Sequence, residues 1–118
     1  MTAQTIGRAG EDYAAEWLIC HGYTIVARNY HSRFGEIDIV ATNASYIVFV
    51  EVKTREQGAV VPPLEAVTKA KQRKLLLTAQ QFLAESKTPL QPRFDVAAVT
   101  LLHGAPMGLQ YFENAFGV

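Results

Sequence analysis

The sequence predicts an α/β protein in which a mixed β-sheet lies between helices. Two stretches, about 5–21 and about 68–86, carry apolar residues at helical spacing. Short runs rich in valine and isoleucine lie between and after these stretches, and their length and pattern are typical of strands. The expected order is helix, three strands, helix and two strands. An order of this kind buries a sheet between helices in a layered sandwich.

The composition is that of an ordinary folded domain. The 118 residues suit a single domain, 1–118, and 49% hydrophobic residues with mixed charge argue against disorder. Eleven basic residues balance eleven acidic ones, so net charge alone gives no indication of nucleic-acid binding. Because we find neither a signal peptide nor an apolar run of membrane length, we expect a cytoplasmic protein without membrane contact. The single cysteine, Cys20, excludes an internal disulfide, and we expect it to be at least half-buried.

The first helix is predicted over about 5–21, with Gly22 as its C-terminal cap. Gly7 and Gly10 disfavour a helix, so we expect both to permit close approach of another backbone. Glu11 lies on the flank of the apolar stripe, where a carboxylate in an early turn also stabilises the helix dipole. The stripe itself contains Ile6, Gly10, Tyr13, Ala14, Trp17 and Leu18.

A first strand is predicted over 23–29, followed by a loop over 30–35 and two further strands over about 35–40 and 46–54. The break between the last two is short enough for a hairpin, which would place these strands side by side. Arg28 and Arg33, in the first strand and the loop, suit contact with phosphate, although isolated arginines are more often simply solvated.

Charged residues interrupt the apolar character of the two hairpin strands. Because side chains alternate along a strand, Glu51 and Lys53 share one face, and Asp38 would stand opposite or diagonal to Glu51. Two adjacent carboxylates repel each other unless a cation lies between them, and Mg2+ or Mn2+ suits such oxygen ligands. A lysine beside this cation would orient water or neutralise a phosphate. The alternative is an edge strand protected by solvated charges.

The second half of the chain continues with a loop over 55–63, a helix from about 64 or 68 to 86 and a turn over 88–92. A strand over 93–102 is apolar on both faces, and the last strand is expected over 109–113. Asp95 lies in the first of these two strands, where a structural ion pair or cap is favoured over catalysis.

The start of the second helix holds the only dense basic cluster of the chain. Cations near a helix N-terminus oppose the helix dipole, so local stability does not explain them, whereas phosphate binding would. The alternative is a solvated helix face. The cluster consists of Lys69, Lys71, Arg73 and Lys74.

Several motifs together resemble a known family. Asp38 followed by Glu51-Val52-Lys53 resembles the PD-(D/E)xK nuclease signature, with Ile37 at the proline position. The wider set resembles the YraN-like family of small bacterial proteins, which is distantly similar to archaeal-type Holliday-junction resolvases, and it covers about 7–112. This set is Gly7-Arg8-x-Gly10-Glu11-x-x-Ala14, Gly35-Glu36-Ile37-Asp38, Phe49-Val50-Glu51-Val52-Lys53-Thr54-Arg55 and Arg93-Phe94-Asp95-Val96.

This resemblance implies a restriction-endonuclease-like three-layer sandwich with the order α-β-β-β-α-β-β. It implies a Mg2+- or Mn2+-dependent endonuclease acting on DNA, branched or otherwise structured, and a homodimer. The implied metal ligands are Asp38, Glu51, the Val52 carbonyl and Glu11. Lys53 would act on the attacking water, with help from Ser32. Nucleic-acid contacts are expected from Arg28, Arg33, Arg55, Lys69, Lys71, Gln72, Arg73 and Lys74.

Two other functions fit the same residues. One is a nucleic-acid-binding or assembly module that keeps the nuclease fold but has little or no catalysis, since site residues alone do not prove turnover. The other is a scaffold whose charges are structural. Metal binding that depends on Asp38 would favour the nuclease, whereas DNA affinity without metal would favour the binding module.

Overall fold

The computed structural model describes residues 3–117. Two long helices and five strands follow each other in the predicted order, with one short 3-10 helix before the second long helix. Neither long helix is apolar enough over its length to cross a membrane. The elements are α1 (Ala3–Cys20), β1 (Thr24–His31), β2 (Glu36–Thr42), β3 (Tyr46–Glu56), η1 (Pro63–Ala66), α2 (Lys69–Ser86), β4 (Gln91–Leu102) and β5 (Ala105–Phe116).

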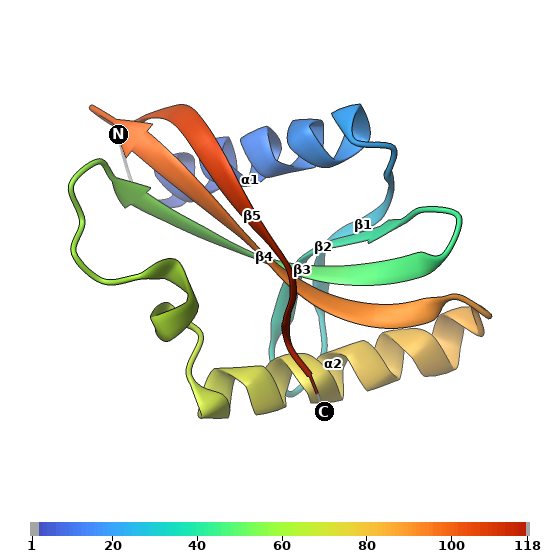
Figure 1. The fold of residues 1–118 in the computed structure, drawn as a ribbon. Helices are drawn as coiled ribbons and strands as arrows, with labels where there is room; N and C mark the ends of the chain where they lie inside the picture. Colours follow the sequence, from blue (N-terminus) through green and yellow to red (C-terminus); the bar gives the residue numbers. More distant parts are fainter. Residues whose placement is uncertain (1–2, 118) are drawn as a thin grey trace.

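The strands form one mixed sheet in the order β1-β2-β3-β4-β5. Neighbouring strands are antiparallel except β3 and β4, which run parallel because the connection through α2 crosses from one end of the sheet to the other. Helix α1 covers one face and α2 covers the other, so the molecule has three layers (Figure 1). The predicted α/β sandwich and its α-β-β-β-α-β-β order are therefore confirmed.

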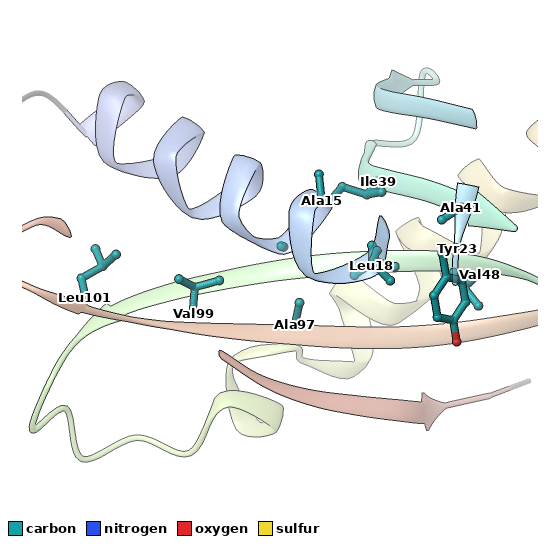
Figure 2. Close-up of a cluster of buried hydrophobic side chains, with 11 residues drawn as sticks. Ala15, Leu18, Tyr23, Ile39, Ala41, Val48, Ala97, Val99 and Leu101 are labelled. Carbon is teal, nitrogen blue, oxygen red and sulfur yellow. The ribbon is translucent and has the colours of Figure 1, made fainter. Parts of the chain in front are cut away.

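Each face of the sheet has its own hydrophobic core, as the alternation along the strands predicts. Val48 and Val50 belong to the cluster beneath α1, which Figure 2 shows together with Leu18 of the helix. Ile47 and Phe49 belong to the other cluster, beneath α2. Because Glu51 follows the same alternation as Ile47 and Phe49, the fold directs its side chain to the α2 layer.

The two glycines of α1 differ in what surrounds them. A Cβ atom at Gly10 would lie 2.0 Å from Cγ2 of Thr54, so the helix approaches β3 there at a distance that only glycine permits. No heavy atom lies within 4 Å of a Cβ atom at Gly7. The expectation of close approach is thus confirmed for Gly10 and wrong for Gly7.

The last hairpin is longer than predicted. Strand β5 covers Ala105–Phe116, whereas the sequence predicted a strand over 109–113 followed by a tail. The turn consists of His103 and Gly104, both with positive φ, and their backbone N–H groups donate to the Glu56 carboxylate at 3.1 and 2.7 Å. Pro106 and Gly108 resemble turn residues in the sequence but pair with β4 beside a register shift.

Other boundaries also differ from the prediction. Strand β1 extends to His31 and so includes the start of the predicted loop. Helix α2 begins at Lys69, because Thr68 caps it through a hydrogen bond from the Lys71 N–H to Thr68 Oγ1 at 3.2 Å. Cys20 is exposed rather than half-buried, since it lies on the outer side of the last turn of α1.

Candidate active site

Asp38 and Glu51 come together at the point where the β2–β3 ladder ends. The last registered pair is Ile39 with Val50, so the next step along both strands would place Asp38 opposite Glu51. At this step a side chain takes the place of a backbone acceptor, because Oδ2 of Asp38 accepts a hydrogen bond from the Val52 N–H at 2.7 Å. Asp38 and Glu51 belong to neighbouring inner strands and therefore lie side by side where this ladder ends, next to the α2 layer.

The two carboxyl groups interact strongly. Burial raises the pKa of Asp38 to about 9, and a hydrogen bond to Glu51 and the negative charge of Glu51 act in the same direction. The Val52 N–H opposes this shift but does not cancel it. Glu51 itself is only 6% exposed. The raised pKa favours the protonated form of Asp38 beside the Glu51 carboxylate.

Two lysines from different elements lie beside this pair. Lys71 of α2 places its Nζ atom 3.3 Å from Oε2 of Glu51. Lys53 of β3 neighbours Lys71, and the pKa of Lys53 is lowered first by burial and then by this contact. The arrangement is a compact group of two acids and two amines, with opposite charges in contact.

Two hollows border the carboxylate pair. Asp38 and Glu51 line a pocket of about 400 Å³, which Lys71 and Lys74 of α2 close on the other side. Asp38 also lines a second pocket of about 670 Å³ towards α1. Glu36 belongs to both walls. Asp38 is consequently accessible from both hollows.

Glu11 lies in the second pocket and is held there by β1. The Nδ2 atom of Asn29 donates to both of its carboxylate oxygens at 3.0 Å, and Arg28 donates to Oε1 from Nε at 3.3 Å and from Nη2 at 3.2 Å. Arg28 also pairs with Asp12 at 2.6 Å. The charge of Glu11 still contributes to the raised pKa of Asp38. Arg28, expected to contact phosphate, is occupied by two acids.

Ser32, Arg33 and Arg55 occupy the surroundings of the site rather than its walls. The Ser32 hydroxyl lies 2.7 Å from Oγ1 of Thr78 in α2 and accepts a bond from the Phe34 N–H at 3.0 Å. The Arg33 guanidinium lies over the Phe34 ring at 4.9 Å. Arg55 donates to the Val61 carbonyl of the following loop. None of the three lines either hollow beside Asp38.

The basic cluster of α2 divides between two sides of the helix. Lys71 and Lys74 face the pocket of the carboxylate pair. Lys69, Gln72 and Arg73 line a separate hollow of about 190 Å³, whose other walls include Phe94 and Phe116. Gln72 also donates to the Val67 carbonyl at 3.0 Å and so closes the start of the helix. The sequence identified the cluster but gave no indication of this division.

Asp95 is in register with Val50 on the neighbouring strand, but it faces the α1 side of the sheet and has a full set of partners. Arg93 donates to it through Nε and Nη2, the Tyr111 hydroxyl donates at 2.6 Å, and the Asn114 N–H donates at 2.9 Å. Arg93 in turn donates to the Tyr23 hydroxyl. Asp95 is fully buried. The expected structural ion pair is therefore present, and it joins β4 to β5.

The donor set for a metal consists of few side chains. Within residues 3–117, no three His, Cys, Asp or Glu side chains come close enough together to hold a metal ion. Asp38 and Glu51 remain as paired carboxylate donors, and oxygen donors of this kind suit Mg2+ or Mn2+, which keep several water ligands. The predicted roles of Glu11 and of the Val52 carbonyl stay predictions.

The contact of Lys71 with Glu51 was not predicted from the sequence. Nothing local distinguishes Lys71 from Lys69 or Lys74, the other lysines of the α2 cluster. Its contact with Glu51 depends on how α2 crosses the sheet, which is a long-range property. Glu36 was expected to share a strand face with Asp38 but was given no role in the site, and the structure places it in the walls of both hollows.

Comparisons with known proteins identify the family. Residues 10–99 match the sequence model described as "Uncharacterised protein family UPF0102". A UPF0102 protein of Bifidobacterium longum subsp. infantis is 42% identical over 120 residues, which cover 98% of this chain and 96% of the relative. Another, of Prosthecochloris aestuarii, is 50% identical over 95 residues, 80% of this chain and 75% of the relative. The resemblance drawn from the motifs is confirmed, and the chain belongs to the UPF0102 family.

Proposed function

We propose that this protein is a Mg2+- or Mn2+-dependent endonuclease that hydrolyses phosphodiester bonds in DNA. The observation that carries the proposal is the pairing of Asp38 with Glu51 in an open pocket, where the pKa of Asp38 rises to about 9 because of burial and of Glu51. A buried structural acid would have cationic partners or several donors. Lys71 pairs with Glu51, but no ion pair reaches Asp38 within residues 3–117, and a hard divalent cation would supply the missing positive charge there.

The charged residues in and beside the pocket have definable parts in such chemistry. Asp38 and Glu51 would hold the cation, and the Val52 N–H keeps the Asp38 carboxylate in place through Oδ2. The bound cation would supply Lewis-acid activation of the phosphate and of water. Lys53, whose pKa is lowered by burial, would orient the attacking water or neutralise charge on the phosphate. Glu11 would support water from the second hollow.

The substrate class is inferred in two steps. Lys71 and Lys74 line the pocket, and the exposed Lys69 and Arg73 continue the positive surface along α2, which suits a phosphate backbone. The further choice of branched DNA, and of a homodimer that would match its symmetry, rests on the resemblance to Holliday-junction resolvases.

The test is a cleavage assay with linear, flapped, gapped and four-way DNA in Mn2+. We expect Lys53→Met to reduce cleavage by about hundredfold or more, because it removes a charge at the reacting phosphate. Lys87→Met, an exposed lysine at the other end of α2, removes the same charge and should retain activity. Equal cleavage by Lys53→Met and the wild-type protein would show that another site or a contaminant cuts the DNA.

A nucleic-acid-binding module with little catalysis is the second candidate. The observation in its favour is that the described residues bring no third acidic side chain close enough to join the pair as a metal ligand. This module would bind DNA in EDTA and lose that affinity when Lys69, Lys71, Arg73 and Lys74 are neutralised together. Binding without metal, together with no cleavage under any condition, would favour it over the nuclease.

A further inference from the structure

Lys71 connects the helix layer to the carboxylate pair. Its Nζ atom lies 3.3 Å from Oε2 of Glu51, and the two side chains differ greatly in exposure, with 43% for Lys71 and 7% for Glu51. The acid is therefore fixed within the sheet, whereas the amine reaches it from the solvent side of the pocket. A long side chain placed in this way can leave without disturbing the core.

The ion pair of Lys71 also occupies the Glu51 carboxylate, which a bound cation would need as a ligand. Asp38 uses Oδ2 for the Val52 N–H, and Glu51 uses Oε2 for Lys71. A divalent cation between the two acids would require Glu51 as a ligand, and an ammonium group at the same carboxylate competes with it for position and charge. Lys71 and the cation thus favour the same oxygen-rich place.

We propose that Lys71 is a built-in counterion of Glu51, which a divalent cation displaces and which then turns to a phosphate oxygen of the nucleic acid. The inference rests on the proposed function, because it assumes the cation and a phosphate substrate. Lys71 would then position Glu51 when no cation is bound and would contact a phosphate when the cation is bound. The other α2 lysine of the pocket, Lys74, would have only the second of these parts.

Lys74 provides the matched control. It belongs to the same helix, lines the same pocket and is exposed. Lys71 has an ion pair with Glu51, whereas Lys74 has none within the part of the chain that the structure describes. Lys71→Met and Lys74→Met therefore remove equal charge from one pocket, and only the first removes the counterion.

The first experiment is calorimetric titration of Mn2+ into the metal-free protein, without nucleic acid. We expect Lys71→Met to bind Mn2+ about fivefold to tenfold more tightly than the wild-type protein, because the competing ammonium is gone. Lys74→Met should change the affinity by less than about twofold, since its charge is solvated. Lys71→Arg keeps the charge and should remain within about threefold of the wild-type protein.

Two outcomes of this titration have different meanings. Unchanged or weaker Mn2+ binding by Lys71→Met, or an equal gain by Lys74→Met, would refute the counterion while leaving the nuclease standing. Absence of Mn2+ binding in the wild-type protein, or equal binding by Asp38→Asn, would instead refute the proposed function and the counterion with it.

The second experiment tests where Lys71 goes after displacement. Binding of a DNA duplex is measured against salt concentration, once in Ca2+ and once in EDTA. We expect Lys71→Met to lower the salt slope by about one in Ca2+ and to leave it unchanged in EDTA, because the lysine reaches phosphate only when a cation occupies the acids. An equal reduction in both solutions would identify Lys71 as an ordinary phosphate contact and overturn the proposal.

Discussion

Two acids of the same sheet, the buried Asp95 and the half-buried Asp38, have opposite surroundings. Asp95 on β4 is fully buried and accepts hydrogen bonds from Arg93, Tyr111 and Asn114. Asp38 on β2 accepts one backbone N–H and lies against a second carboxylate, that of Glu51. The comparison distinguishes an acid that has its own ion pair, Asp95 with Arg93, from Asp38, which has no ion-pair partner within residues 3–117. The first locks the sheet, and the second suits a functional site.

The largest effect that sharpens this comparison is expected at Asp95. Asp95→Asn should lower the free energy of unfolding by about 3 kcal/mol, because it leaves the Arg93 guanidinium, which is 10% exposed, with only the longer ion pair to Glu113 at 3.8 Å. Urea unfolding measures this change. The same substitution at Asp38 should not destabilise the metal-free protein. Similar losses of unfolding free energy at both positions would contradict the proposed difference between Asp95, which has an ion pair, and Asp38, which has none.

The next effect is a pH dependence at Asp38. Its folded pKa of about 9 lies far above the ordinary value near 3.8, so between these values the folded state holds a proton that the unfolded state has lost. Stability of the metal-free protein should therefore fall as pH rises through this window. Asp38→Asn should flatten the slope and be more stable at pH 9 by at least about 1 kcal/mol.

Thermal unfolding in EDTA at pH 5, 7 and 9 measures this difference between Asp38→Asn and the wild-type protein. The chelator matters, because a bound cation would hold Asp38 ionised and remove the effect. If the stability of the two proteins changed with pH in the same way, the raised pKa of Asp38 would be contradicted.

The smallest effect concerns one hydrogen bond of the Asp95 site. Tyr111→Phe removes the hydroxyl that donates to Asp95 Oδ2 at 2.6 Å. This should lower the free energy of unfolding by about 1 to 2 kcal/mol, because the bond is made to a buried carboxylate. Tyr30→Phe removes a hydroxyl that donates to the exposed Glu85 carboxylate and accepts from Gln81 at 3.1 Å, and it should cost no more than about 0.5 kcal/mol. Equal costs in urea unfolding would mean that burial of Asp95 is not the cause.

The sequence predicted the parts of the molecule that depend on neighbouring residues. The order of elements followed from periodicity, and the position of Asp38 beside Glu51 followed from strand alternation and a short hairpin. The structural role of Asp95 was also expected. In these cases the geometry depends on residues close together in the sequence, so the sequence pattern is sufficient to predict it.

The parts that the sequence did not predict depend on contacts between distant elements. Lys71 reaches Glu51 only because α2 crosses the sheet above β3, and Asn114 reaches Asp95 only through a register shift in β5. Pro106 and Gly108 favour a turn locally, but pairing with β4 overrides that preference. The exposed Cys20 shows the same limit, since exposure depends on how the helix is oriented on the sheet.

The most direct test of Asp38 as an acid without an ion-pair partner is the number of protons that Mn2+ displaces on binding. Titration calorimetry at pH 7 in buffers of different ionisation enthalpy gives this number. Because Asp38, with a pKa of about 9, carries a proton at this pH, we predict release of about one proton by the wild-type protein. Asp38→Asn should release none and bind Mn2+ weakly. Binding without proton release, or equal binding by both proteins, would contradict the account.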